Sequence, residues 1–229
     1  MKTIGLLGGM SWESTASYYQ AINQEIKAKL GGLHSAKIIL NSVDFHDIET
    51  LQHQGKWQET AEILRDAARS VEAGGAHCLL ICTNTMHKVA DEIEQAINIP
   101  ILHITDSTAK ALAQRGISKV GLLGTKFTME QAFYKTRLTN SFGIDVLVPD
   151  AKERDDIHNI IYQELCLGEI KKASKSRYLE IINNLFAQGA QGVILGCTEI
   201  ALLIKQEDTD VPLFDTTRLH AQAAVKFAL

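Results

Sequence analysis

The chain of 229 residues contains a repeat that spans about half of its own length. The segment 75–85, GAHCLLICTNT, aligns with the segment 189–199, GAQGVILGCTE, which begins 114 positions later. Two further pairs are residues 4–8 with 120–124, at a separation of 116, and residues 99–102 with 211–214, at a separation of 112. The small differences between these separations are of the size that loops of unequal length produce. The repeat therefore predicts two halves that share the order of their secondary-structure elements.

Short apolar runs alternate with amphipathic helical patterns in both halves, which is typical of βαβ units and mostly parallel sheets. We expect strands at residues 3–7, 36–41, 77–82, 101–104, 119–123, 145–148, 192–195 and 213–214. We expect helices at residues 14–30, 57–73, 107–115, 129–142, 155–167 and 175–188. The predicted fold class is α/β: two pseudo-symmetric domains of parallel sheet flanked by helices, with an active site in the interdomain cleft at the carboxyl ends of the strands.

Composition argues against several classes of protein. The net charge is −4 and both signs are mixed along the chain, so a nucleic-acid partner is not expected. The longest apolar runs, such as Val193–Leu195, are far shorter than a membrane span, so no membrane partner is expected either. Residues 1–10 are broken by glycines and are interpreted as the first strand rather than as a signal peptide. The four cysteines lack the spacing of a disulfide framework, which favours a cytoplasmic location.

Each copy of the repeat ends its apolar strand on a group that can carry a proton, Thr83 in the first half and Cys197 in the second. Two related halves that face each other would place these groups on opposite sides of one cleft, as inversion of a stereocentre requires. Asn84, Thr85 and Thr198 add donors at the expected helix starts, where a carboxylate could bind. The alternative is that these residues only cap helices and pack. Two polar junctions in repeat register favour a site.

The expected position of Cys197 at a helix N-terminus also predicts a lowered thiol pKa and a reactive thiolate. In the first half, the glycines of residues 7–14 let the backbone approach a ligand, although a simple tight turn fits equally well. Ser11 or Ser14 can cap the helix that follows. The glycine spacing of a dinucleotide site is absent from this loop.

Cysteine and histidine side chains near residue 80 suggest a metal site, but no second pair with zinc-finger spacing follows, and no metal is expected. Cys78 is assigned to the core. His87 is expected in the first helical turn after the strand, where it would pack or donate a hydrogen bond. Lys171 and Lys172 lie in a polar segment that reads as a solvated turn, from which one lysine could reach a cleft.

Three segments resemble the aspartate/glutamate racemase family: GGMSWES at residues 8–14, CTNTMH at 82–87 and GCTE at 196–199. The resemblance covers essentially the whole chain, and it is greatest to the bacterial aspartate/glutamate or broad-specificity branch. It implies an isomerase that needs no cofactor, acts on a small-molecule amino acid and forms a homodimer. It implies a first domain of residues 1–100 plus 208–229 and a second of 101–207. The implied substrate contacts are Met10, Gln52, Thr83, Asn84, Thr85, Cys197, Thr198, Glu199 and, more loosely aligned, Lys171. Gln52 is expected in a loop.

The chain departs from the family at Thr83, because members usually carry cysteine immediately before the asparagine. The thiol of Cys82 is shifted by one residue, which on a strand places it on the opposite face. A threonine hydroxyl is a much poorer acid and base than a thiol. The resemblance implies that Cys197 faces the L-enantiomer, so we expect aspartate or glutamate to be racemised with a preference for the L-form.

Several alternatives remain open from the residues. They are a broad-specificity amino-acid racemase, a dicarboxylate isomerase or decarboxylase that protonates from one side, and a carboxylate-binding protein with little turnover. A nucleotide-dependent enzyme fits least, because the chain lacks the glycine fingerprint.

Overall fold

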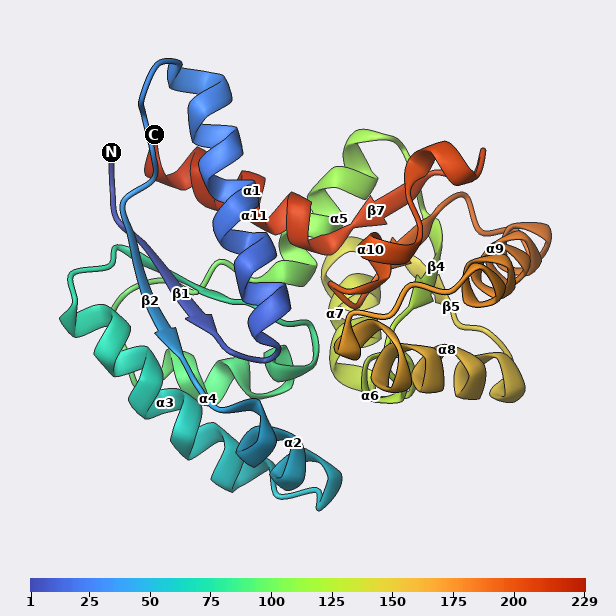
Figure 1. The fold of residues 1–229 in the computed structure, drawn as a ribbon, viewed down its shortest axis with the longest axis horizontal. Helices are drawn as coiled ribbons and strands as arrows, with labels where there is room; N and C mark the ends of the chain where they lie inside the picture. Colours follow the sequence, from blue (N-terminus) through green and yellow to red (C-terminus); the bar gives the residue numbers. More distant parts are fainter. The chain divides into compact units, whose positions relative to one another are not determined.

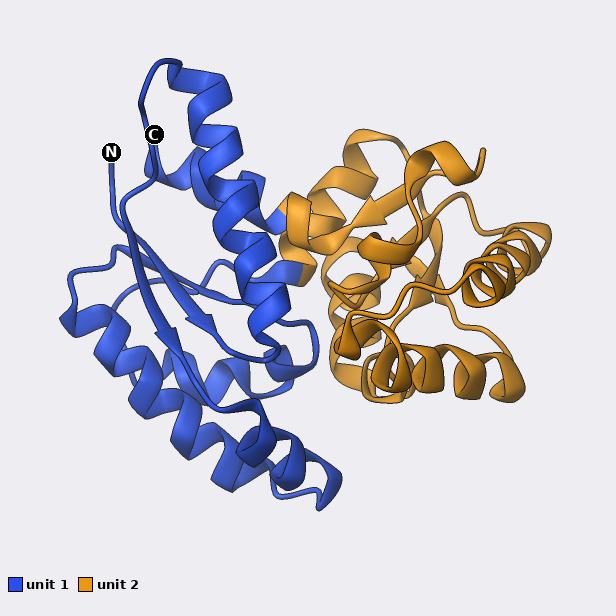
Figure 2. Ribbon diagram, in the orientation of Figure 1, with its two compact units in different colours: residues 1–104, 220–229 blue, residues 105–219 orange.

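The computed structural model describes residues 1–229, which form two compact units (Figure 2). Unit 1 consists of Met1–Ile104 and His220–Leu229, and unit 2 of Thr105–Leu219. The expectation that residues 208–219 belong to the first domain is wrong, because strand β7 (Leu213–Asp215) pairs with β6 (Val193–Leu195) of unit 2. Residues 101–104 belong to unit 1 rather than to the second domain, because Ile101 forms a bridge with Leu79.

Unit 1 is built on a parallel sheet with the strand order β2-β1-β3, of which β1 and β2 are labelled in Figure 1. The bridge between Leu79 and Ile101 continues this sheet beyond β3. The strands are β1 (Ile4–Gly8), β2 (Ile38–Ser42) and β3 (Cys78–Ile81). The helices are α1 (Trp12–Leu30), α2 (Phe45–His53), α3 (Trp57–Ala73), η1 (Thr85–Val89), α4 (Ala90–Glu94) and α11 (Thr216–Ala228). Helix α11 belongs to unit 1 from His220 onward.

Unit 2 is built on a parallel sheet with the order β5-β4-β6-β7. Its strands are β4 (Lys119–Leu123), β5 (Asp145–Leu147), β6 (Val193–Leu195) and β7. Its helices are α5 (Ile104–Gln114), α6 (Lys126–Glu130), α7 (Ala132–Phe142), α8 (Ala151–Gln163), η2 (Leu165–Leu167), α9 (Lys172–Ala187), α10 (Ile200–Leu203) and η3 (Gln206–Asp208). Helix α5 begins at the last residue of unit 1 before the boundary.

The two sheets repeat one topology. In each unit the first strand lies in the middle, with the second strand on one side and the third on the other. The fourth position is filled by the Ile101 bridge in unit 1 and by β7 in unit 2. Thr83 is the second residue after β3, and Cys197 is the second residue after β6. The fold therefore carries both candidate groups to equivalent positions.

The side chains of β3 alternate between two apolar clusters, one on each face of the sheet. Leu79 and Ile81 pack in a core cluster with residues of α3, whereas Cys78, Leu80 and Cys82 pack in a second cluster with residues of α1 and α11. Helices thus cover both faces of this sheet, with α3 on one side and α1 and α11 on the other (Figure 1). A sheet buried on both faces requires a continuously apolar strand. Polar side chains are then accommodated only where the strand ends.

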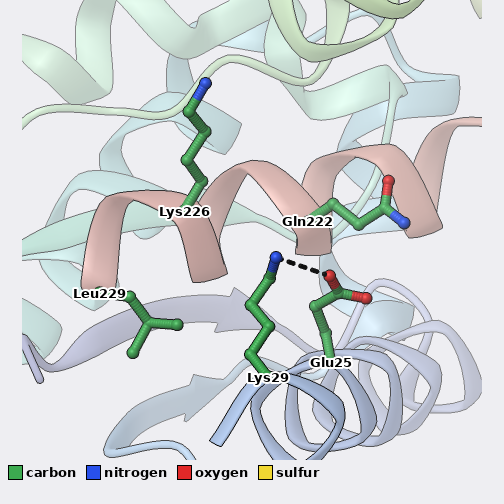
Figure 3. Close-up of a pocket in the computed structure, with 5 residues that line it drawn as sticks. All are labelled: Glu25, Lys29, Gln222, Lys226 and Leu229. Atoms are coloured by element: carbon green, nitrogen blue, oxygen red, sulfur yellow. Dashed lines mark ion pairs between the residues drawn. The ribbon is translucent and has the colours of Figure 1, made fainter.

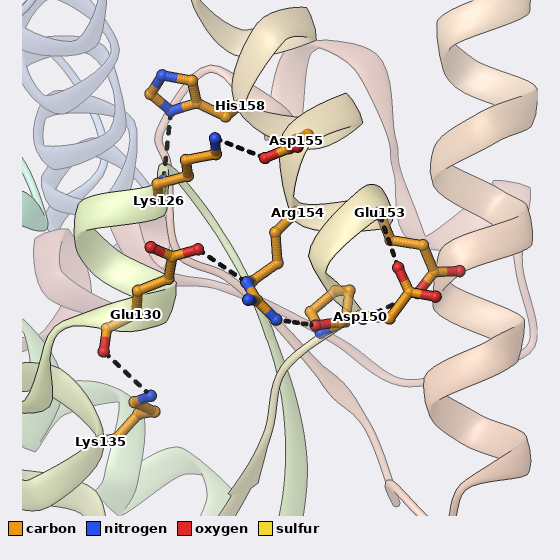
Figure 4. Close-up of polar contacts among 9 residues, drawn as sticks. Lys126, Glu130, Lys135, Asp150, Glu153, Arg154, Asp155 and His158 are labelled. Carbon is orange, nitrogen blue, oxygen red and sulfur yellow. Dashed lines mark hydrogen bonds and ion pairs between the residues drawn. The ribbon is translucent and has the colours of Figure 1, made fainter.

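Helix α8 begins at a capping box, in which Asp150 accepts from the Glu153 backbone N–H at 2.9 Å and Glu153 accepts from the Asp150 backbone N–H at 3.3 Å. These two bonds satisfy donors that the first turn leaves unpaired. Next to the cap, Arg154 donates to the Glu130 carboxylate at 2.9 Å (Figure 4). This ion pair ties α8 to α6 in unit 2.

The predicted helix at residues 57–73 and the predicted strand at 119–123 are confirmed to the residue. The expected strand at 101–104 is only an isolated bridge, after which α5 begins at Ile104. The expected helix at 129–142 is two helices that meet at Gln131, where the backbone is extended. Helices α2 and α11 were not predicted. None of the helices has both the length and the apolar character that a membrane crossing requires.

Candidate active site

The first candidate group lies in a bend between β3 and η1. Thr83 is half-buried, and Asn84 and Thr85 are buried. The Ser14 hydroxyl donates to the Cys82 carbonyl at 2.8 Å, and the His87 ring bonds to the Thr83 carbonyl at 2.8 Å. The helix expected after this strand is only the short η1, followed by the five residues of α4. Side-chain donors rather than a helix dipole are therefore the anion-binding groups that this segment offers.

The loop after β1 brings its backbone very close to β2. Gly9 has a φ of +94°, and a side-chain carbon at this position would overlap the carbonyl oxygen of Val43. The Gly9 N–H donates to the Thr15 hydroxyl at 2.8 Å. Ser11, rather than Ser14, is the N-cap of α1, since its side chain accepts from the Ser14 N–H at 3.3 Å. Only glycine fits this turn, which agrees with the tight turn that the sequence offered, while the expected approach of this backbone to a ligand stays a prediction.

Met10 and Gln52 are two of the predicted substrate contacts in unit 1. Met10 is buried and belongs to the core cluster that includes Leu64. Gln52 is also buried, and it lies near the end of α2. The expectation that Gln52 lies in a loop is wrong, because Asp44 caps a helix that continues to His53.

The second candidate group is joined to a buried carboxylate. Cys197 and Thr198 are half-buried, while Glu199 is only 5 % exposed. The Cys197 thiol donates to Glu199 Oε2 at 2.9 Å, and the Thr198 hydroxyl donates to the same oxygen at 2.7 Å. The three consecutive residues after Gly196 therefore form one hydrogen-bonded group in unit 2.

The protonation of Cys197 differs from the sequence prediction. Burial raises the pKa of the Cys197 thiol well above its ordinary value, and the negative charge of Glu199 raises it further. The prediction of a lowered pKa for Cys197 is wrong for two reasons. Helix α10, which follows, has only four residues and provides little helix dipole, and the nearest charge is the negative charge of Glu199. The resting form of Cys197 in this unit is the neutral thiol.

Cys78, the first residue of β3, and Cys82, which directly follows β3, are structural. All four cysteines are free, and Cys78 and Cys82 are fully buried, as predicted for Cys78. Burial raises the pKa of Cys78 to about 11 and raises the pKa of Cys82 as well. Both thiols pack against the same core cluster and point away from the side chains around Leu79. No group of three or more histidine, cysteine or acidic side chains has an arrangement that could hold a metal ion.

Lys171 is exposed at the start of α9, in unit 2. Its ammonium group pairs with Glu169 at 2.9 Å and with Glu164 at 3.5 Å. Hydrogen bonding to Glu169 raises the pKa of Lys171, so it stays charged. Lys172 is the first residue of α9 and is also exposed. A substrate carboxylate that binds Lys171 has to compete with two carboxylates already present.

A cavity of about 460 Å³ lies in unit 1 between α1 and α11 (Figure 3). Its lining includes Lys29, which pairs with Glu25 at 3.5 Å, and Lys226. None of the residues predicted for the site lines this cavity.

Sequence reasoning missed two relationships at these strand ends. One is the hydrogen bond from Cys197 to Glu199, two positions on. The other is the bond between His87 and the Thr83 carbonyl, for which the four-residue spacing was the available signal.

Comparison with known proteins places the chain among racemases. Residues 7–224 match the family described as Asp/Glu/Hydantoin racemase. The crystal structure of a putative Asp/Glu racemase from Yersinia pestis is 57% identical, with a TM-score of 0.93 over 100% of this chain and 99% of that one. An aspartate racemase homologue from Pyrococcus horikoshii is 35% identical, with a TM-score of 0.87 over 100% and 99% of the two chains. A broad-specificity amino-acid racemase of Bacillus subtilis is 24% identical over 97% of this chain and 96% of its own length.

Proposed function

Because the chain belongs to the Asp/Glu/hydantoin racemase family, we propose that it is a cofactor-independent racemase of aspartate or glutamate that favours the L-enantiomer. The observation that carries this proposal is the equivalence of Thr83 and Cys197, each the second residue after the third strand of its unit. We attribute the equivalence to duplication of one α/β unit. In this proposal both strand ends act on a single substrate molecule, from opposite faces of its α-carbon.

The substrate's α-carboxylate is bound by Asn84, Thr85 and Thr198, and the Thr198 hydroxyl exchanges its hydrogen bond to Glu199 for one to the substrate. Two of these side chains are buried and the third is half-buried, so their donors act where water competes poorly. Donors fixed around the carboxylate also stabilise the charge that enters it when the α-proton leaves. Met10, Gln52 and Lys171 complete the substrate contacts, with Gln52 and Lys171 as the groups for the distal carboxylate.

Removal of the α-proton begins at Cys197. The neutral thiol first passes its proton to the Glu199 carboxylate, to which it is already hydrogen-bonded at 2.9 Å. The substrate's ammonium group favours this transfer, since a nearby positive charge lowers the pKa of a thiol. The thiolate then takes the α-proton of the L-amino acid. The electron pair of the broken C–H bond is delocalised into the carboxylate.

Return of a proton to the other face is the task of Thr83. Its hydroxyl donates a proton to the carbanion and takes one from water. The hydroxide that this leaves is neutralised by the proton that Glu199 received from Cys197, which restores the Glu199 carboxylate. The reverse direction requires the hydroxyl to remove an α-proton from the D-form. An alcohol is a far weaker base than a thiolate near neutral pH, which is why the proposed enzyme favours L-substrates.

The same pair also fits a second function. A competent thiol on one side and a weak relay on the other suit a decarboxylase or isomerase of dicarboxylates, which protonates from one face only. A broad-specificity racemase and a carboxylate-binding protein with little turnover are further outcomes of the test. We also propose that the protein acts as a cytoplasmic homodimer without a nucleic-acid partner. Four free cysteines suit a reducing compartment, and a net charge of −4 suits the absence of nucleic acid.

The test is a panel of L- and D-amino acids, with arylmalonate and maleate added, incubated with the wild type and with Cys197→Ala. Chiral chromatography should show D-aspartate or D-glutamate forming from the L-form in the wild type only. Uncharged amino acids should react much more slowly. Consumption of arylmalonate or maleate without any racemisation would instead establish the second function.

A further inference from the structure

His87 is buried beside Thr83 and uses both of its ring nitrogens. The side chain is 4 % exposed. Its Nδ1 lies 2.8 Å from the Thr83 carbonyl oxygen, and its Nε2 lies 3.2 Å from the backbone nitrogen of Ile104. The ring of His103 lies against it, with 4.4 Å between the ring centroids. One imidazole thus connects the bend that holds Thr83 with the residue at which the chain leaves unit 1.

The partners determine which nitrogen carries the proton. The backbone N–H of Ile104 can only donate, so Nε2 of His87 accepts. The Thr83 carbonyl can only accept, so Nδ1 carries the hydrogen and donates. The His87 ring is therefore the neutral Nδ1–H tautomer. A neutral ring whose two nitrogens are both engaged by the backbone is suited to holding a segment in place.

Fixing the backbone at residue 83 also fixes its hydroxyl. Threonine is β-branched, and its χ1 angle is restricted to a small number of staggered positions. Once the Thr83 peptide is held by His87, and the Cys82 carbonyl by Ser14, few directions remain for the hydroxyl. The backbone N–H of His87 also donates to the Asn84 carbonyl at 3.2 Å, so the same residue closes the next turn.

We propose that His87 is a positioning residue for proton delivery by Thr83, an assignment that rests on the proposed racemase function. Its ring holds the Thr83 carbonyl, and this hold directs the hydroxyl toward the α-carbon. Misplacement of a reacting group by about 1 Å can slow a reaction about a hundredfold. Loss of the ring should therefore impair the Thr83 step specifically and spare the Cys197 step.

The experiment separates these two steps. The enzyme is given L-glutamate and L-aspartate in deuterated water, and two products are measured. Deuterated L-substrate reports removal and return of the proton on the Cys197 side, and deuterated D-product reports delivery from the Thr83 side. The inversion ratio is defined as D-product formed divided by deuterium incorporated into the L-form. A general loss of folding lowers both products and leaves this ratio unchanged.

Four variants are compared with the wild type. His87→Leu removes both hydrogen bonds, and His87→Gln keeps a donor and an acceptor. Thr83→Val removes the hydroxyl itself. The matched control is His220→Gln, because His220 is another buried histidine of unit 1 that bonds to the Leu102 carbonyl and to Tyr18. Its ring lies 5.8 Å from that of His87, between centroids, and it bonds to the backbone near Ile104 without bonding to Thr83.

The inversion ratio should fall at least about tenfold in His87→Leu, in the same direction as in Thr83→Val, and should recover in part in His87→Gln. His220→Gln should leave the ratio unchanged. If His87→Leu does not fold, His87→Gln must still lie between Thr83→Val and the wild type. Nitrogen NMR of the wild type should in addition show the Nδ1–H tautomer of His87.

The assignment would be overturned by an unchanged inversion ratio in His87→Leu or by an Nε2–H tautomer of His87. If His87→Leu does not fold, a His87→Gln ratio equal to that of the wild type would overturn it. A wild type that exchanges and inverts normally in these cases leaves the proposed function intact. A wild type that neither exchanges nor inverts acidic amino acids refutes the proposed function, and the assignment of His87 with it.

Discussion

The Cys197 thiol donates a hydrogen bond of 2.9 Å to the carboxylate of Glu199, which is almost fully buried. A thiol beside a buried carboxylate is held in its neutral form, because formation of the thiolate would place two negative charges side by side. In the proposed mechanism, this thiol proton has to move to Glu199 before Cys197 can act as a base. This relationship gives Glu199 two opposing effects, one on the reactivity of the thiol and one on turnover.

Replacement of Glu199 by glutamine should separate those effects. Loss of the negative charge lowers the pKa of Cys197, so alkylation of this thiol by iodoacetamide, followed by mass spectrometry of its peptide, should become faster. Racemisation of L-substrate should nevertheless fall by roughly a hundredfold, because the acceptor for the thiol proton is lost. Glu207→Gln, at an exposed position of η3, is the matched control and should change neither rate. Slower alkylation in Glu199→Gln would contradict this account of the pair.

Thr83→Cys should raise the rate of conversion of D-glutamate to the L-form by at least about tenfold, because a thiol is a far better base than a hydroxyl. Initial rates in both directions, measured by chiral chromatography, provide the check. Thr83→Val, which keeps the shape and removes the hydroxyl, should abolish D-product from L-substrate. A D-to-L rate in Thr83→Cys no higher than that of the wild type would show that residue 83 is not the second proton carrier.

Gly9→Ala should lower the free energy of unfolding by at least about 3 kcal/mol, because the added carbon combines a positive φ with overlap of the Val43 carbonyl. Gly116→Ala is the matched control, since Gly116 also has a positive φ, of +67°, but has open space around it. It should cost only about 1 kcal/mol. Urea denaturation of the two variants compares them directly, and equal losses would refute the packing argument.

Stability should depend on pH through His220. Burial lowers the pKa of His220 to about 4, whereas the unfolded chain binds this proton near pH 6.5. Between these values the unfolded state holds more protons than the native state, so stability falls as the pH falls. From about pH 7 to about pH 5, the wild type should lose about 2 kcal/mol more than His220→Gln in urea denaturation. An identical pH dependence in the two proteins would contradict the prediction.

The sequence was sufficient for the architecture because the apolar pattern of each half is regular. The strand at residues 119–123 and the helix at 57–73 have clear periodicity and clear ends, and both were located to the residue. Ile101 failed as a strand because a short apolar run next to a proline does not reveal whether it pairs over several residues or only one. Helix α2 was missed for a similar reason, since its pattern is short and weakly apolar.

The places of the two candidate groups in the fold were predictable, whereas the protonation of Cys197 was not. Repeat register located Thr83 and Cys197, because it depends only on the order of residues along equivalent strands. The pKa of Cys197 depends on burial and on which way Glu199 turns, and neither is visible in the local pattern. The bond from His87 to the Thr83 carbonyl likewise required the backbone geometry of η1.

The most direct measurement of the central claim is proton NMR of L-aspartate and L-glutamate in deuterated water, with the wild type compared with Cys197→Ala. The wild type should replace the α-hydrogen by deuterium, and Cys197→Ala should reduce this exchange to the rate seen without enzyme. Exchange by Cys197→Ala at the wild-type rate would contradict the claim that this thiol removes the α-proton of the L-amino acid.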